Sequence, residues 1–156
     1  MSITVVQGQT APAGDFRKRL GEDLPCFQCG ICCSRYRVVV SYPEARKICE
    51  GLGLNWYFFL SNYLESRDGW ESYYIRQRDG ACIFLKAVEN PARRICLIQA
   101  WKPSTCREWM PGIFRRECQE GLWQYWGLKV TPEGEIQGTA EQIRAFEKAL
   151  RTFRQV

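Results

Sequence analysis

The residues best suited to chemistry in this chain are its nine cysteines, four of which stand within the eight-residue run Cys26–Cys33. The run has the form CxxCxxCC, and its two-residue gaps let a tight loop point successive sulfurs toward one centre. The chain contains no histidine, so any metal that it holds must be held mainly by sulfur. The spacing therefore predicts a cysteine-ligated metal site, but it does not indicate what the metal is for.

Within this run, Cys26, Cys29 and Cys32 have the CxxCxxC spacing that one iron–sulfur cube or one zinc ion can use, with a fourth ligand from elsewhere. Gly30 allows a positive φ and lets backbone N–H groups face the sulfurs. Cys33 directly follows Cys32, and the side chains of adjacent residues usually diverge. We therefore expect Cys33 to serve a second centre or to be a structural thiol.

A second group of thiols, Cys82, Cys96 and Cys106, lies far downstream. Each of them alone could be a buried core thiol, which is the usual role of cysteine. Lys102 and Arg107 stand close to the last two in sequence, and such cations would offset the negative charge of a thiolate site. The pattern favours metal binding, which requires the fold to bring distant segments together.

The remaining two cysteines are not predicted as ligands. Cys49 falls on the apolar stripe of a predicted helix, which favours a place in the core. Cys118 aligns with Phe114 and Leu122 on one helical face and is also expected in the core. It would nevertheless supply an eighth ligand if two complete four-sulfur centres exist, and the sequence leaves this open.

The cysteines are expected to be thiols, not disulfides. The N-terminus has neither a basic leader nor an apolar run, the longest apolar stretch (residues 55–60) is far too short to cross a bilayer, and the cysteine count is odd. These features predict a cytoplasmic protein in a reducing environment, with no membrane partner.

The composition, with 46% hydrophobic and 25% charged residues, is that of a globular chain. The net charge of +5 is modest, so dispersed solubilising charge is favoured over a nucleic-acid-binding stripe. Without histidine the chain cannot build a Ser-His-Asp triad or a Cys-His pair. It also has no glycine-rich phosphate loop. Whether it is an enzyme stays open.

The sequence pattern predicts an α+β fold: a small single domain with helices packed around a small antiparallel sheet and cysteine-rich metal-binding loops. Residues 1–23 are predicted to be a loosely docked lead-in, and residues 24–156 a metal-binding domain with a C-terminal helix. Thr105-x-x-Glu108 resembles a capping box that would place Cys106 at a helix N-terminus. Helices are predicted over 43–52, 55–65, 105–111, 113–126 and 140–154, and strands over 35–40, 72–77, 81–85 and 94–98.

Four sequence blocks in this order resemble the bacterial YkgJ-type cysteine-cluster family, the CxxCxxCC zinc- or iron-chelating domain, over residues 24 to 118. They are Cys26-x-x-Cys29-Gly30-x-Cys32-Cys33, Cys82-Ile-Phe-Leu85, Cys96-x-Ile98 and Pro103-x-x-Cys106-Arg107. Lys102 stands where the family usually has arginine, and Ile83 where it often has proline, and neither departure removes a thiol. The resemblance implies a small cytoplasmic metal-binding domain with seven cysteines as expected ligands: Cys26, Cys29, Cys32, Cys33, Cys82, Cys96 and Cys106.

The sequence is compatible with three functions. The first is an iron–sulfur or iron-binding protein that acts in electron transfer or as an accessory to a larger enzyme, with a protein partner. The second is a structural zinc module whose surface binds a protein or nucleic acid. The third is a methylase-like transferase, because the flagellin lysine methylase has a similar cysteine cluster, although no substrate domain is evident in this chain.

Overall fold

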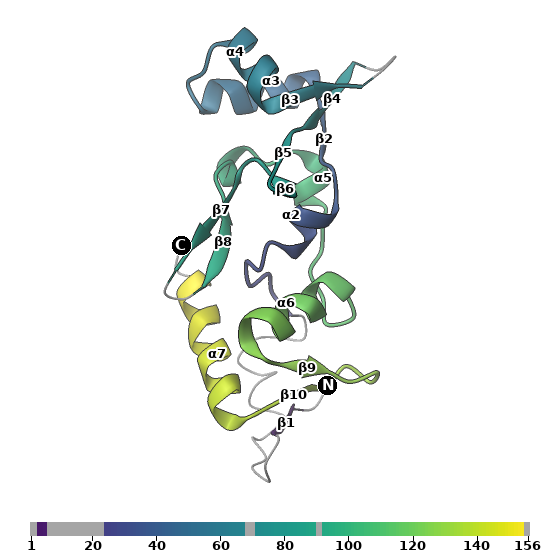
Figure 1. Cartoon of the computed structure of the whole chain (residues 1–156), viewed down its shortest axis with the longest axis vertical. Coiled ribbons are helices and arrows are strands. Elements are labelled where there is room, and N and C mark those ends of the chain that lie inside the picture. The colour runs from purple at the N-terminus through teal and green to yellow at the C-terminus, as the bar shows by residue number, and fades with distance from the viewer. Residues whose placement is uncertain (1–2, 6–23, 68–70, 90–91, 155–156) are drawn as a thin grey trace. The chain divides into compact units, whose positions relative to one another are not determined.

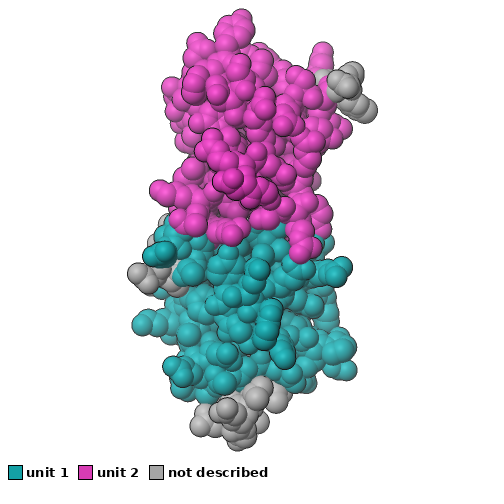
Figure 2. All heavy atoms as spheres, viewed as in Figure 1, with its two compact units in different colours: residues 1–31, 88–93, 111–156 teal, residues 32–87, 94–110 magenta. Residues whose placement is uncertain are grey.

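The computed structural model describes residues 3–5, 24–67, 71–89 and 92–154 (Figure 1). The described part is α+β, with helices and small, mostly antiparallel sheets, so the predicted fold class is confirmed. Most of the predicted lead-in, residues 6–23, lies outside the described residues. The chain divides into two compact units (Figure 2): unit 1 comprises residues 1–31, 88–93 and 111–156, and unit 2 comprises residues 32–87 and 94–110.

The middle of the chain alternates short helices with short strands. Strands β2, β4 and β3 form a three-stranded antiparallel sheet in that order, and β5–β6 and β7–β8 form two-stranded sheets. The elements are α2 (Ile31–Arg35), β2 (Val39–Ser41), α3 (Tyr42–Gly51), α4 (Trp56–Tyr63), β3 (Leu64–Ser66), β4 (Ser72–Ile75), β5 (Gln77–Arg78), β6 (Ala81–Cys82), β7 (Leu85–Val88), β8 (Arg93–Cys96), a 3-10 helix at Gln99–Trp101, and α5 (Ser104–Arg107).

Local sequence signals explain the two longer helices of unit 2. Helix α3 begins with a capping box, in which the Glu44 backbone N–H donates to Ser41 Oγ at 3.3 Å and the Ser41 backbone N–H donates to Glu44 Oε2 at 2.9 Å. Helix α4 begins at an Asn55 cap, whose Oδ1 accepts from the Tyr57 N–H at 3.0 Å. Both helices were predicted from the apolar periodicity, with bounds that differ by one or two residues.

The core of unit 2 lies between these helices and one face of the sheet. At its centre, the Tyr63 ring stacks on Phe59 and on Phe84, with centroid distances of 5.5 and 5.4 Å. Burial of such aromatic rings is a main stabilising contribution. The fully or nearly fully buried apolar residues of this core are Val38, Val40, Ala45, Ile48, Cys49, Phe59, Leu64, Ile75, Phe84 and Ile98.

The structure corrects several predicted elements, including the following in unit 2. The strand predicted over 35–40 is instead the end of helix α2, closed by a hydrogen bond from the Tyr36 N–H to the Cys32 carbonyl at 3.1 Å, followed by the short strand β2. The helix predicted over 55–65 stops at Tyr63, because the next residues form strand β3 beside β4. The Thr105 capping box is absent, since α5 starts after Pro103 without a side-chain cap of its own.

Unit 1 packs two helices against the segment that carries the first cysteines. Its elements are β1 (Ile3–Val5), α6 (Arg116–Trp126), β9 (Lys129–Val130), β10 (Ile136–Gly138) and α7 (Ala140–Arg154), with β10 between β1 and β9. The bounds of α7 match the prediction. Phe146 on α7 contacts both Phe27 and Trp126 edge-on, at 5.4 and 5.5 Å between ring centroids. Across the described ranges, no helix has the combined length and apolar character that spanning a membrane would require.

Candidate metal centre

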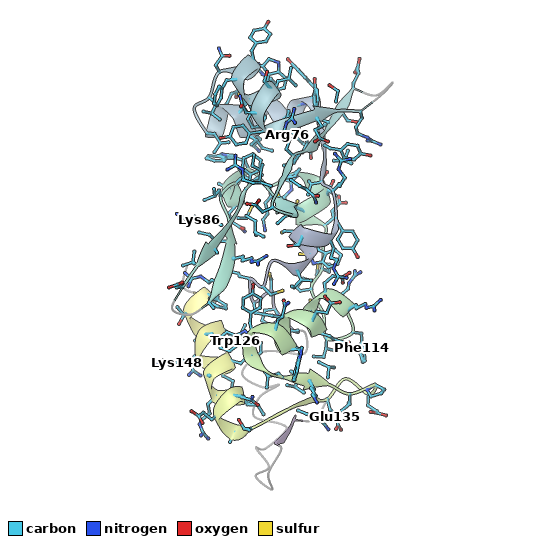
Figure 3. The ribbon with its side chains drawn as sticks, viewed as in Figure 1. Arg76, Lys86, Phe114, Trp126, Glu135 and Lys148 are labelled. Carbon is cyan, nitrogen blue, oxygen red and sulfur yellow. The ribbon has the colours of Figure 1, made fainter. Side chains whose placement is uncertain are left out.

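The nine cysteines, all within the described residues, fall into two sets, and no disulfide joins any of them. Unit 1 holds Cys26, Cys29 and Cys118, and unit 2 holds the other six. Figure 3 draws the side chains with sulfur in yellow. Apart from the core thiol Cys49, the unit 2 set consists of predicted ligands, namely Cys32, Cys33, Cys82, Cys96 and Cys106.

Cys82 and Cys96 occupy equivalent positions on two adjoining turns. Each is the last residue of a short strand, β6 or β8, and each sulfur accepts a hydrogen bond from the backbone two residues later, at Phe84 or Ile98. The Leu97 N–H donates to the Phe84 carbonyl at 2.9 Å, which joins the two turns. Backbone N–H groups that face sulfur in this way stabilise thiolates, as metal ligands require.

Cys106 lies on helix α5, which is held by contacts from two other elements. The Ser104 N–H donates to Glu44 Oε1 at 2.8 Å, and Thr105 Oγ1 donates to the Val39 carbonyl at 3.0 Å. The Glu44 carboxylate therefore caps both α3 and α5. The signal for the α3 cap was visible in the Ser41-x-x-Glu44 spacing, but the α5 cap depends on residues 60 positions apart.

The thiol of Cys106 lies close enough to those of Cys82, Cys96 and Cys32 to be affected by them electrostatically. Burial, together with negative charge at the other three thiols, raises the pKa of Cys106 to about 11, although the Lys102 ammonium lowers it. Burial also raises the pKa of Cys82 and of Cys96. Cys106 is thus within electrostatic range of one thiol of the CxxCxxCC run and of the other two downstream thiols.

The adjacent thiols Cys32 and Cys33 interact directly on helix α2. A hydrogen bond between their side chains raises the pKa of Cys32, and burial raises it further. The prediction that neighbouring side chains diverge is therefore wrong for this pair, because the short helix holds both sulfurs within hydrogen-bonding reach. Arg94 Nη1 donates to Ser34 Oγ, next to Cys33, at 3.4 Å. Arg94 is therefore a second cation near the thiols of unit 2, in addition to Lys102.

The donor chemistry of this set suits zinc or iron, which both take thiolate ligands. Among the described residues, no three cysteine, aspartate or glutamate side chains are gathered tightly enough to hold an ion as they stand. A metal that displaces the thiol protons would draw the sulfurs to coordination distance as it binds. The sulfurs, the facing backbone donors and the cations fit a metal–thiolate centre. The seven-ligand set itself stays a prediction.

The first two cysteines of the run belong to a tight loop in unit 1. Cys26 is exposed and Cys29 is buried, and the loop turns through the left-handed φ values of 58° at Gln28 and 73° at Gly30. The expected positive φ at Gly30 is confirmed. Left-handed residues thus alternate with residues of negative φ. Such alternation directs successive N–H groups into one concavity, an arrangement common at anion-binding and iron–sulfur sites.

The loop packs on helix α6 at Gly121, where only glycine fits. A Cβ at this position would lie 2.5 Å from Cys29 Sγ and 3.0 Å from a ring carbon of Phe27. Cys118, one helical turn earlier on α6, is buried in the same apolar cluster as Cys29. The expected core position of Cys118 is therefore confirmed by its burial. Its possible role as an eighth ligand stays open.

We expect Gly121→Ala to destabilise unit 1 by about 1–3 kcal/mol, because the new methyl group would displace Cys29 and Phe27 in a packed core. Urea unfolding followed by tryptophan fluorescence measures the change. Gly112→Ala is the matched control, since its Cβ would meet only Arg115 Cγ at 3.8 Å. A Gly121→Ala protein as stable as this control would contradict the close packing.

Removal of the Glu44 carboxylate should loosen α5. Burial alone would raise the pKa of Glu44, but hydrogen bonds from the Ser104 and Ser41 backbone outweigh it, and the pKa is lowered. The stabilisation is therefore present above the ordinary value of 4.5 and is lost as the pH falls through the lowered folded-state pKa. Glu44→Ala should cost about 1–2 kcal/mol at neutral pH.

The difference between Glu44→Ala and the unchanged protein should shrink in acid, as chemical unfolding at several pH values would show. Glu50→Ala on the same helix is the control, because the Glu50 side chain is 72% exposed. Its ion pair with Arg46 is long at 4.0 Å and therefore weak. Equal stability of the two variants at neutral pH would show that the Glu44 bridge does not stabilise α5.

Comparison with known proteins points to the same chemistry. A family model described as "CxxCxxCC: Putative zinc- or iron-chelating domain" matches residues 25–122, which include every predicted ligand. No curated protein and no solved structure gives a match.

Proposed function

The chain belongs to the CxxCxxCC family of zinc- or iron-chelating domains, and from this we propose that it binds iron, as an iron–sulfur cluster or as single ions, for electron transfer or as an accessory to a larger enzyme. The residues that would hold the metal in unit 2 are Cys32, Cys82, Cys96 and Cys106. Iron would supply a redox couple there, which zinc cannot.

The observation that carries this proposal is the pair of turns at Cys82 and Cys96, each with a backbone donor two residues on that faces the sulfur. Hydrogen bonds to sulfur tune the potential of iron–sulfur centres. The chain also has more thiols than a single zinc ion requires. Thiolates of this kind persist in reducing compartments, which supports a cytoplasmic location.

A structural zinc site is the second candidate, because the four thiols come from four separate elements: α2, β6, β8 and α5. An ion bound by all four would cross-link most of the second half of unit 2 and replace part of its core. This role needs no redox change. It predicts that the metal-free protein loses stability and not only an activity.

Anaerobic purification followed by a visible spectrum and assays for iron, zinc and acid-labile sulfide separates these candidates. A brown protein that contains iron, with or without sulfide, and that bleaches with dithionite would support the iron proposal. A colourless protein with stoichiometric zinc would overturn it in favour of the structural site. Absence of both metals after anaerobic purification and reconstitution would overturn both candidates.

A further inference from the structure

The sheet β2–β4–β3 carries a charged surface on the face that turns away from the core. Side chains alternate along a strand, so Tyr73 and Ile75 point into the core while Tyr74 and Arg76 point outward. The antiparallel register places Val39 and Glu65 beside Tyr74. We call this surface the arginine face; its residues are Arg37, Val39, Glu65, Arg67, Ser72, Tyr74 and Arg76.

Two of the three guanidinium groups of this face lie over the Tyr74 ring. Arg37 Cζ lies 4.1 Å and Arg67 Cζ 5.1 Å from the centroid of the Tyr74 ring, and both make cation–π contacts with it. Arg67 Nη1 also donates to Ser72 Oγ at 3.1 Å. Such contacts reduce the conformational entropy that an arginine loses when it binds a ligand.

The face has an excess of positive charge. Glu65 is its one carboxylate among the described residues of these strands, and it pairs with Arg37 and lies 3.9 Å from Arg76 Nη1, beyond hydrogen-bonding distance. The side chains of Arg37 and Arg76 are 48% and 41% exposed. One acid group shared between two exposed arginines leaves donors for an external acceptor.

The backbone of Arg76, which Figure 3 labels, is hydrogen-bonded on both sides. Its backbone N–H donates to the Tyr63 carbonyl at 2.8 Å, and its carbonyl accepts from the Ile83 N–H at 3.0 Å. Its Nε is buried and makes no hydrogen bond within the described residues. A donor left unsatisfied costs free energy that a bound acceptor can recover through a small rotation of the side chain.

We propose that the arginine face docks an acidic segment of a partner protein. Guanidinium groups bind carboxylates through paired hydrogen bonds, which suits the exposed, oriented arginines of this face. A single-stranded nucleic acid would need an open aromatic ring for base stacking, and two arginines already cover Tyr74. This docking goes beyond the metal chemistry and does not depend on which metal is bound.

The test measures binding of a labelled peptide of alternating aspartate and glycine to the full-length, metal-loaded protein by fluorescence anisotropy at low and at physiological salt. We expect binding that weakens with salt, and at least a roughly tenfold loss in the double variant Arg37→Gln/Arg76→Gln. The matched control, Arg116→Gln/Lys148→Gln, removes the same charge from exposed positions of unit 1 and should bind like the unchanged protein.

A second double variant, Arg37→Lys/Arg76→Lys, keeps the positive charge but removes the planar guanidinium groups. It should also weaken binding, and it should fold like the unchanged protein because the charge and side-chain length are similar. An equal loss in the unit 1 control would show that net charge alone drives binding and would overturn the proposal. It would also be overturned by an absence of peptide binding at low salt. Tighter binding of a single-stranded oligonucleotide of equal net charge would assign the face to nucleic acid instead.

Discussion

Replacing Cys96 with serine should lower the affinity for metal by at least about 100-fold, measured by competition with a chromophoric chelator under anaerobic conditions. Cys96 ends strand β8, accepts a backbone hydrogen bond from Ile98, and lies close enough to Cys106 to affect its pKa. A serine hydroxyl stays protonated at neutral pH and is a poor ligand for a soft metal ion. Loss of the Cys96 sulfur would leave Cys82 without its counterpart on the adjoining turn.

Cys49→Ser is the matched control in the same unit. The Cys49 sulfur is buried on α3 and donates to the Leu54 carbonyl at 3.1 Å, a hydrogen bond that a hydroxyl can also make. This variant should keep the metal affinity of the unchanged protein. If Cys96→Ser and Cys49→Ser hold metal equally well, the turns at Cys82 and Cys96 are not part of a metal site.

Metal affinity should also rise steeply with pH. The pKa values of Cys82, Cys96 and Cys32 are raised, and that of Cys106 is raised to about 11, so these thiols are protonated at neutral pH. Each proton that the metal displaces contributes about a tenfold gain in affinity per pH unit. Four displaced protons therefore predict a change approaching 10,000-fold per unit, the upper limit set by that rule.

Chelator competition at a series of pH values between mildly acidic and mildly alkaline gives this slope, and calorimetry in buffers of different ionisation enthalpy counts the released protons independently. Metal affinity should rise with pH because the pKa values are raised: acid keeps the thiols protonated, and alkali deprotonates them to thiolates that bind metal. Cys106→Ser should reduce the slope by about one proton. A flat profile would mean that the sulfurs are already thiolates or are not the ligands.

Elements with strong local signals were predicted well. Helix α7 has the predicted bounds because its apolar residues repeat with helical spacing over four turns. The turn between β5 and β6 lies at Asp79–Gly80, a dipeptide typical of hairpins, and both residues adopt left-handed φ values of 53° and 79°. Short segments were predicted less well: Cys32 and Cys33 lie in a helical turn where a loop followed by a strand was expected, since five-residue elements carry too little periodicity.

The sequence by itself determined the chemistry of this protein: with no histidine and a CxxCxxCC run, the candidate ligands are sulfurs, and their spacing indicates a metal. The tertiary structure decided which sulfurs share one environment. Cys106 lies within electrostatic range of Cys82, Cys96 and Cys32, and Glu44 holds the helix of Cys106 from 60 residues away. Such groupings depend on how strands pair and helices pack across long sequence separations, and no local pattern of residue types encodes them.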